Sequence, residues 1–246
     1  AAAGMVRLAH AYQECFEPHG LSVAQILLTR DDSENRRRYL NARSTLTTLL
    51  DIGAIPLINE NDSVATDEIR FGDNDRLAAR VATMISADLL VLLSDIDGFY
   101  NKDPNSDVEA KLIPKVTEIT PAIEKMAGVA ISKDTSGGMI TKLEAARICM
   151  NAGCHMFIGN GNRKNPIKYM VEKKIFTKFI PKISALAARK KWIVSSLSYS
   201  GKIFIDYGAA RALENGKSLL AAGIIKIKGE FSKGENILIV DEQEKS

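Results

Sequence analysis

Short apolar runs that are rich in β-branched residues recur along the first part of the chain, and helix-like segments separate them. The runs are VAQILLT at 23–29, IPLIN at 55–59, DLLVLLSD at 88–95 and HMFIGNG at 155–161. The segments with helical periodicity are 34–50, 75–86 and 139–151. Strands that are apolar on both faces and alternate with helices are typical of a parallel sheet covered on both sides. The sequence therefore predicts an α/β fold, a three-layer sandwich around a mainly parallel sheet.

The pattern changes near residue 190. From Trp192 onward, short strand-like runs with glycine turns replace the alternation: GKIFID, GIIKIKGEF and ENILIV, with one small helix at 209–214. Lys and Arg outnumber Asp and Glu over residues 181–246. A composition of 46% hydrophobic and 26% charged residues suits one large or two smaller domains. We therefore predict a first domain at 1–184, a linker at 185–190 and a small β-rich domain at 191–246.

The two ends of the chain suggest that it is part of a longer protein. Its apolar pattern and its cysteines suggest a cytoplasmic location. The chain opens inside a helical pattern without a capping residue or an initiating Met, and it stops just after a strand-like run. We therefore expect it to begin and end inside domains. It has no apolar run long enough for a membrane span and no secretory leader. Cys15, Cys149 and Cys154 are expected to be reduced core thiols, because they form no partner set and have no secretory context. The spacing of Cys149, Cys154 and His155 matches no zinc pattern.

Acids and amides cluster in two neighbouring stretches, INEND at 58–62 and FGDND at 71–75. One such residue caps a helix by accepting hydrogen bonds from its first amides, and we assign this role to Asp73. The stretches hold more acids than capping requires. Ligands in parallel sheets bind beyond the carboxyl ends of the strands, where Ser94 and Asp95 also lie. The surplus acids could hold a substrate amino group, align cationic side chains or share a metal ion.

A second chemical stretch, SGGMITKLEAA at 136–146, places two glycines before a helix and Lys142 one turn inside it. Bare glycine amides at a helix start and a lysine in that turn can bind phosphate, although a Gly-Gly loop alone is more often just a turn. Met139, Leu143 and Ala146 are predicted to face the core. Together with the strand-end acids, the arrangement favours phosphoryl transfer, which needs mainly positioning and charge neutralisation.

These motifs in combination resemble the glutamate 5-kinases, members of the amino acid kinase family that carry a C-terminal PUA domain. The resemblance covers nearly the whole chain, through INENDSVATDEIRFGDND, LLVLLSDIDGFYNKDP, SGGMITKLEAA, RKKWIVSS and GAARALENGKSLLAAGI. It implies an amino acid kinase fold and transfer of the γ-phosphate of ATP to the side-chain carboxylate of L-glutamate, the first step of proline biosynthesis.

The resemblance also implies roles for individual residues. Asp62 and Asn74, with Asp73 beside them, would bind glutamate. Asp75 would orient the catalytic lysines, and Lys142 would stabilise the transferring group. The nucleotide would contact residues of two stretches, namely Ser94, Asp95, Ser136, Gly137, Gly138, Met139, Ile140, Thr141 and Lys142. No protein ligand to a metal is assigned.

The expected cofactors are ATP and Mg²⁺, the expected partners are L-glutamate and further copies of the chain, and proline is implied as a feedback ligand. Neither a membrane nor a nucleic acid is an expected partner. The family begins with a strand that ends in a lysine-and-glycine turn, followed by a Ser-Gly loop, and neither occurs in this sequence. We therefore expect this polypeptide alone to be inactive.

Two alternative functions are compatible with the residues. One is another kinase of the same family that acts on aspartate, acetylglutamate or carbamate, although the INEND stretch and the PUA-like tail argue against it. The other is an RNA-binding protein that acts through the basic PUA-like tail. That tail has few aromatics for base stacking, so solvated lysines are the simpler interpretation.

Overall fold

The computed structural model describes residues 2–64, 73–129, 138–183, 201–231 and 237–241. The chain divides into two compact units, residues 1–190 and 191–246. The linker expected at 185–190 lies outside the described residues. Among the helices that are described, none has both the length and the apolar character needed to cross a bilayer.

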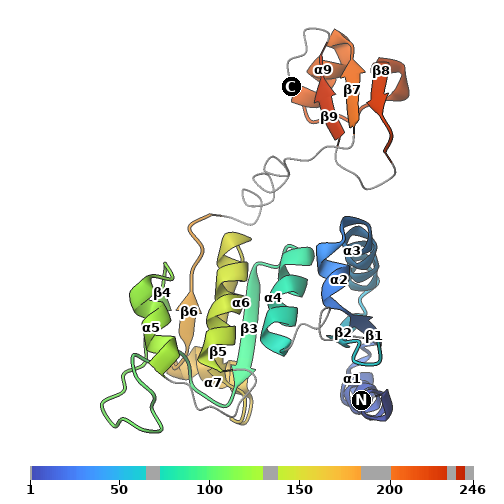
Figure 1. The fold of residues 1–246 in the computed structure, drawn as a ribbon. Coiled ribbons are helices and arrows are strands. Elements are labelled where there is room, and N and C mark those ends of the chain that lie inside the picture. The colour runs from blue at the N-terminus through green and yellow to red at the C-terminus, as the bar shows by residue number, and fades with distance from the viewer. Residues whose placement is uncertain (1, 65–72, 130–137, 184–200, 232–236, 242–246) are drawn as a thin grey trace. The chain divides into compact units, whose positions relative to one another are not determined.

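Helices and strands alternate along the first unit (Figure 1). Its helical elements are α1 (Ala2–Phe16), η1 (Glu17–His19), α2 (Arg30–Glu34), α3 (Arg36–Asp51), α4 (Asn74–Met84), α5 (Pro121–Val129), α6 (Met139–Asn151) and α7 (Pro166–Lys173). Its strands are β1 (Val23–Leu28), β2 (Ile55–Glu60), β3 (Leu89–Ser94), β4 (Lys115–Val116), β5 (His155–Asn160) and β6 (Thr177–Phe179). The four apolar runs of the sequence are β1, β2, β3 and β5, as predicted.

The strands of this unit pair mainly in parallel, which confirms the predicted α/β class. β1 pairs with β2 in parallel, and a four-stranded sheet has the order β3-β5-β6-β4. In this sheet β3–β5 and β4–β6 are parallel, while β5–β6 is antiparallel. The described strands thus form two separate sheets, and Ser94 at the end of β3 lies opposite Asn160 at the end of β5.

Helix α4 stands between the two sheets and contributes to two hydrophobic cores (Figure 1). Its Ala79 and Ala82 belong to a core shared with α6 and the four-stranded sheet. Its Leu77, Val81 and Met84 belong to a second core with β1 and α3. Because α4 is apolar on two sides, each side packs against one of the two cores. Helix α4 therefore lies between the two cores.

Helices pack on both faces of β5 in the four-stranded sheet. Successive side chains of a strand point to opposite faces, so different residues of β5 meet the two helices. Met156 and Ile158 are fully buried in the core that contains α6. On the other face, a Cβ atom added at Gly159 would come within 2.5 Å of the Met170 sulfur on α7. The glycine therefore allows α7 to pack directly against the strand.

The buried Thr177 hydroxyl links the end of this sheet to two connecting segments through hydrogen bonds. The Thr177 hydroxyl on β6 accepts a hydrogen bond from the Phe99 amide at 2.7 Å and donates one to the Ile113 carbonyl at 2.7 Å. Thr177 is fully buried. Buried backbone groups need partners, so a single side chain here satisfies two connecting segments.

Thr177→Val is expected to lower the free energy of unfolding by about 1–3 kcal/mol, because valine keeps the shape but leaves the Phe99 amide without its acceptor. Urea titration followed by circular dichroism measures the change. Thr48→Val is the matched control, because the Thr48 hydroxyl bonds the Ser44 carbonyl on the exposed side of α3. Equal losses for the two variants would contradict the structural role of Thr177.

The second unit is small and rich in β-structure, as predicted. It contains a three-stranded sheet of order β8-β7-β9, formed by β7 (Gly201–Ile205), β8 (Ile224–Gly229) and β9 (Ile237–Val240). The strands β7 and β8 are antiparallel, and β7 and β9 are parallel. A short helix, α9 (Tyr207–Glu214), is capped by the Asp206 side chain, and a 3₁₀ turn, η2 (Ala221–Gly223), precedes β8.

Some local predictions differ from the structure. The helix expected over 34–50 is interrupted at Asn35, whose side chain accepts the amides of Arg37 and Arg38 and starts α3 anew. Helix α1 buries only Met5, so Cys15, which was expected in the core, is exposed. Cys149 and Cys154 are buried as predicted. A hydrogen bond between the two thiols, together with burial, raises the pKa of Cys149, which keeps that thiol protonated.

Candidate active site

Asp73 begins helix α4. Its carboxylate accepts a hydrogen bond from the Arg76 amide at 2.8 Å, and its backbone is extended. This geometry satisfies one of the unpaired amides of the first turn and places negative charge at the positive end of the helix dipole. The predicted capping role of Asp73 is thus confirmed, and the other polar residues of this turn are left for other contacts.

The structure joins Asp75 of α4 to Lys142 of α6, across 67 residues of sequence. The Lys142 ammonium donates a hydrogen bond to the Asp75 Oδ2 atom at 2.9 Å. The Thr141 hydroxyl lies 3.3 Å from the same oxygen and 2.8 Å from the Gly138 carbonyl. The acid and the lysine that the sequence singled out therefore form one group.

This pair lies at the ends of two helices. Asp75 is in the first turn of α4, and Lys142 follows Gly138, the N-cap residue of α6. The side chains of Lys142 and Asp75 are only 11% and 19% exposed. A buried ammonium needs a counter-charge, and the positive ends of two helix dipoles increase that need. The arrangement therefore concentrates positive potential beside one carboxylate, which is suited to attracting an anion.

A second polar group lies at the carboxyl ends of β3 and β5. The Ser94 hydroxyl donates to the Asp95 carboxylate at 3.0 Å, and the Asn160 side-chain amide donates to the Asp95 carbonyl at 3.4 Å. The Gly161 amide binds the Ser94 carbonyl at 2.7 Å. Ser94 and Asp95 therefore lie at the carboxyl end of β3 as predicted, and Asn160 at the end of β5 joins them through its side chain.

The segment after β3 also carries a partly buried charge. The Asp97 Oδ1 atom is buried without a hydrogen-bond partner among the described residues, and the Arg163 guanidinium lies 3.9 Å from it. Burial and the nearby Asp97 carboxylate raise the pKa of Tyr100. The Arg163 guanidinium also lies 5.3 Å from the ring centre of Tyr169. This end of the sheet therefore combines a carboxylate, a cation and an aromatic face.

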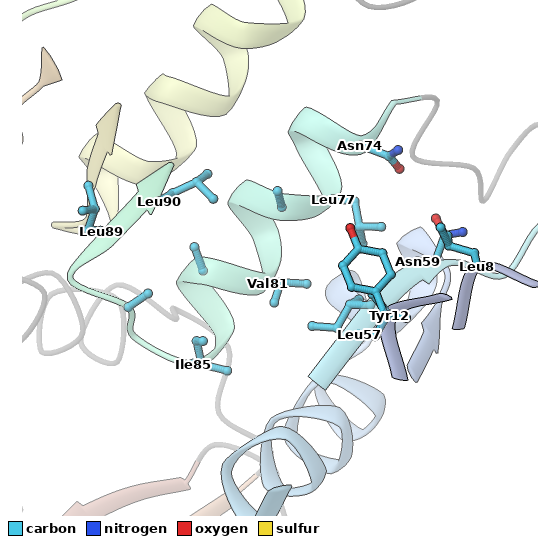
Figure 2. A pocket seen from close by; sticks show the side chains of 14 residues that line it. Leu8, Tyr12, Leu57, Asn59, Asn74, Leu77, Val81, Ile85, Leu89 and Leu90 are labelled. Atoms are coloured by element: carbon cyan, nitrogen blue, oxygen red, sulfur yellow. The ribbon is translucent and has the colours of Figure 1, made fainter. Parts of the chain in front are cut away.

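A cavity of about 460 Å³ lies beside α4, between β2 and β3 (Figure 2). Its walls are mostly apolar, with Leu57, Leu77 and Leu90 among the lining residues. Figure 2 shows the two asparagines that line it, Asn74 at the start of α4 and Asn59 on the facing strand β2. An apolar cavity with a few placed amides is a common form of ligand site.

The structure describes most of the other residues that the sequence singled out, but not all of them. Gly138, Met139 and Ile140 form the cap and first residues of α6, whereas Ser136 and Gly137 lie outside the described residues. The predicted core-facing residues of α6 include Leu143 and Ala146, and both are buried. Asp62 follows β2 by two positions, and its role in binding stays a prediction.

Sequence reasoning missed two charged residues beside the Asp75–Lys142 pair. Arg76 of α4 binds Glu144 of α6, with 2.6 Å between the Arg76 Nε and Glu144 Oε2 atoms. Arg76 also lies 3.5 Å from the Asp73 carboxylate. The i,i+3 spacing from Asp73 to Arg76 is a local signal for the second contact, but no local pattern connects Arg76 with Glu144.

No group of three His, Cys, Asp or Glu side chains in the described parts of the chain is placed to hold a metal ion. The carboxylate of Asp75 is already paired with Lys142.

Comparison with known proteins identifies relatives along almost the whole chain. The glutamate 5-kinase of Paramagnetospirillum magneticum is 57% identical over 241 residues, and that of Rhodospirillum rubrum is 54% identical over 240. The glutamate 5-kinase of Rhodopseudomonas palustris is 53% identical over 239 residues. These alignments cover 97–98% of this chain and 64–65% of the relatives, so the chain spans about 65% of their length.

Two family models match the chain, and they correspond to different parts of it. The PUA domain model matches residues 201–246, within the β-rich unit. The model of the amino acid kinase family matches residues 1–160, which include Asp75, Lys142 and the ends of β3 and β5. Because this match extends over more than half of the sequence, the chain belongs to the amino acid kinase family.

Proposed function

We propose that this chain provides the catalytic region of a glutamate 5-kinase, which transfers the γ-phosphate of ATP to the side-chain carboxylate of L-glutamate. The observation that carries the proposal is the buried Lys142 ammonium, held by Asp75 at the meeting point of two helix N-termini. The names of the relatives, glutamate 5-kinase at 53–57% identity, supply the substrate.

The proposed reaction needs no proton transfer. A side-chain carboxylate oxygen of glutamate attacks the γ-phosphorus of ATP, and the bond from that phosphorus to the β,γ-bridging oxygen breaks. The bond electrons leave with ADP, and glutamyl 5-phosphate forms. Because the transferred group carries its charge on three oxygens, catalysis depends on placing cations and amides around it.

In this scheme Lys142 stabilises the transferring group, and Asp75 holds the lysine in place without acting as a base. Gly138, Met139, Ile140 and Thr141 at the start of α6 would line the phosphates together with Ser136 and Gly137, because helix N-termini favour phosphate. Ser94 and Asp95, with their bonded neighbour Asn160, would contact the rest of the nucleotide.

Magnesium is proposed to arrive with the nucleotide as part of the substrate. Mg²⁺ commonly takes its ligands from substrate phosphates and water, with few protein carboxylates. Bound there, the ion neutralises phosphate charge.

Glutamate is proposed to bind where Asn74 and Asp62 lie. Asn74 lines the cavity beside α4, and its amide can both donate and accept hydrogen bonds. Asn59, which lines the same cavity, is an additional candidate. Asp73 stays a predicted member of this group, although its carboxylate already accepts the Arg76 amide.

Asn74→Ala tests this assignment in a polypeptide that carries these residues at the full length of the relatives. The KM for glutamate is expected to rise about 5- to 100-fold while the KM for ATP stays nearly unchanged, because a lost hydrogen bond to a charged substrate is worth about 1–3 kcal/mol. Coupled measurement of ADP formation gives both constants. Asn41→Ala, at an exposed position of α3, is the matched control. Equal increases in both KM values would contradict the assignment.

Further properties are proposed from the family resemblance. They are a cytoplasmic location, assembly of several copies of the chain, and proline as a feedback ligand. The relatives do not favour the two alternatives, another amino acid kinase or an RNA-binding protein, because the names of all three relatives are glutamate 5-kinase.

A further inference from the structure

Two ion pairs of opposite polarity join α4 and α6 side by side. In one, the acid Asp75 is on α4 and the base Lys142 is on α6, 2.9 Å apart. In the other, the base Arg76 is on α4 and the acid Glu144 is on α6. The Arg76 Nε and Nη2 atoms lie 2.6 and 2.5 Å, respectively, from the Glu144 Oε2 atom. Arg76 directly follows Asp75, and Glu144 lies two residues after Lys142.

The second pair is anchored to the start of α4. The Arg76 Nε atom lies 3.5 Å from the Asp73 carboxylate, which itself accepts the Arg76 amide. Asp73 is 10% exposed at its side chain. The N-cap of α4, the guanidinium and the carboxylate of Glu144 therefore form a continuous chain of charged contacts from one helix to the other.

The core that α4 and α6 share below these pairs contains several small side chains. Fully buried residues between α4 and the rest of the core include Ala79 on α4 and Ala145 and Ala146 on α6. Alanine side chains carry one methyl group, so they allow close approach but offer few projecting atoms to fix the position of one helix along another. A slip of one residue moves a helix by about 1.5 Å, which is enough to break a charged hydrogen bond.

We propose that Glu144, acting through Arg76, is a positioning residue that holds the first turns of α4 and α6 in register and so keeps Lys142 on Asp75. The proposal deepens the proposed function and rests on it for its catalytic consequence. Arg76 and Glu144 are each 39% exposed, and partly exposed ion pairs contribute little to global stability. The effect of Glu144 is therefore local, on the lysine that is expected to contact the transferring phosphate.

The first test uses Glu144→Gln in the 246-residue chain, without substrates. The variant and the parent chain are acetylated under limiting reagent, and the rate at Lys142 is read by peptide mass spectrometry. Loss of the pair is expected to raise the rate at Lys142 about two- to fivefold, the factor that corresponds to one such ion pair. Thermal melting verifies that the variant is folded.

Glu124→Gln is the matched control. Glu124 of α5 pairs with Arg147, which lies further along the same helix α6, and both partners are 49% exposed. Removing this pair should leave the acetylation rate of Lys142 unchanged. An unchanged rate at Lys142 in folded Glu144→Gln, or the same increase in both variants, would overturn the proposal.

The second test separates this inference from the proposed function. In the full-length polypeptide, Glu144→Gln is expected to lower kcat about two- to fivefold with little change in the KM for glutamate, whereas Glu124→Gln keeps the parental kcat. Faster acetylation with an unchanged kcat would support the positioning of Lys142 and overturn its catalytic role. A lower kcat without faster acetylation would overturn the positioning inference.

Discussion

Lys142→Met is expected to lower kcat by about 10²- to 10³-fold, the usual cost of one well-placed group that stabilises transition-state charge. Methionine keeps a long apolar stem of similar shape but removes the ammonium that contacts Asp75 at 2.9 Å. The KM for glutamate should change little, because the proposed contact is with the transferring phosphate and is strongest in the transition state. Steady-state assays of glutamate-dependent ADP formation in a full-length polypeptide measure both constants.

The control for this variant is Lys168→Met on α7, where the lysine is 71% exposed and lies 3.8 Å from Glu172. It removes the same charge from a solvated helix surface and should keep parental activity. Unfolding must be excluded, because Lys142→Met leaves the partly buried Asp75 without its cation. A folded Lys142→Met protein with near-parental kcat would show that Lys142 does not act on the phosphoryl group.

Asp75→Asn is expected to lower kcat by about 10- to 100-fold, because asparagine retains an oxygen for Lys142 but loses the charge that fixes the ammonium. A carboxylate nucleophile carries no proton at neutral pH, so Asp75 is not needed as a base. The effect of Asp75 on kcat is therefore expected to depend entirely on Lys142. The decisive measurement is the kcat of the Asp75→Asn, Lys142→Met double variant.

Residues that act as one unit show strongly non-additive effects. The double variant should thus be no slower than Lys142→Met alone. A double variant slower by the product of the two single effects would indicate that Asp75 has an independent role. Asp51→Asn, at the end of α3, provides the control for an acid-to-amide change away from this site.

Local pattern predicted the elements that position the site. The runs that became β1, β2, β3 and β5 are short, apolar and bounded by turn residues, so they can be recognised without their neighbours. The bounds predicted for α6 are those observed, Met139–Asn151, because two glycines precede it and its apolar residues have helical spacing. The cap at Asp73 was predictable for a similar reason, since capping involves atoms only three residues apart.

Other elements could not be predicted with the same means. Helices α5 and α7 and strands β4 and β6 were not expected, because their segments are short and take their stability from packing on the sheet. Helix α1 has a helical pattern, yet its Val6 is 69% exposed. Periodicity indicates which residues share a face, but it does not say whether another element covers that face.

The sequence by itself determined the α/β class, the positions of the main strands along the chain and the two stretches that carry Asp75 and Lys142. Only the tertiary structure decided that these two side chains bind each other, that Asn59 and Asn74 line one cavity, and that Arg76 and Glu144 form a second link. Strand and helix periodicity come from neighbours within a few residues, which the sequence displays directly. Contacts between residues 67 or 68 positions apart depend instead on how α4 and α6 pack, and that packing is set by the shared core as a whole.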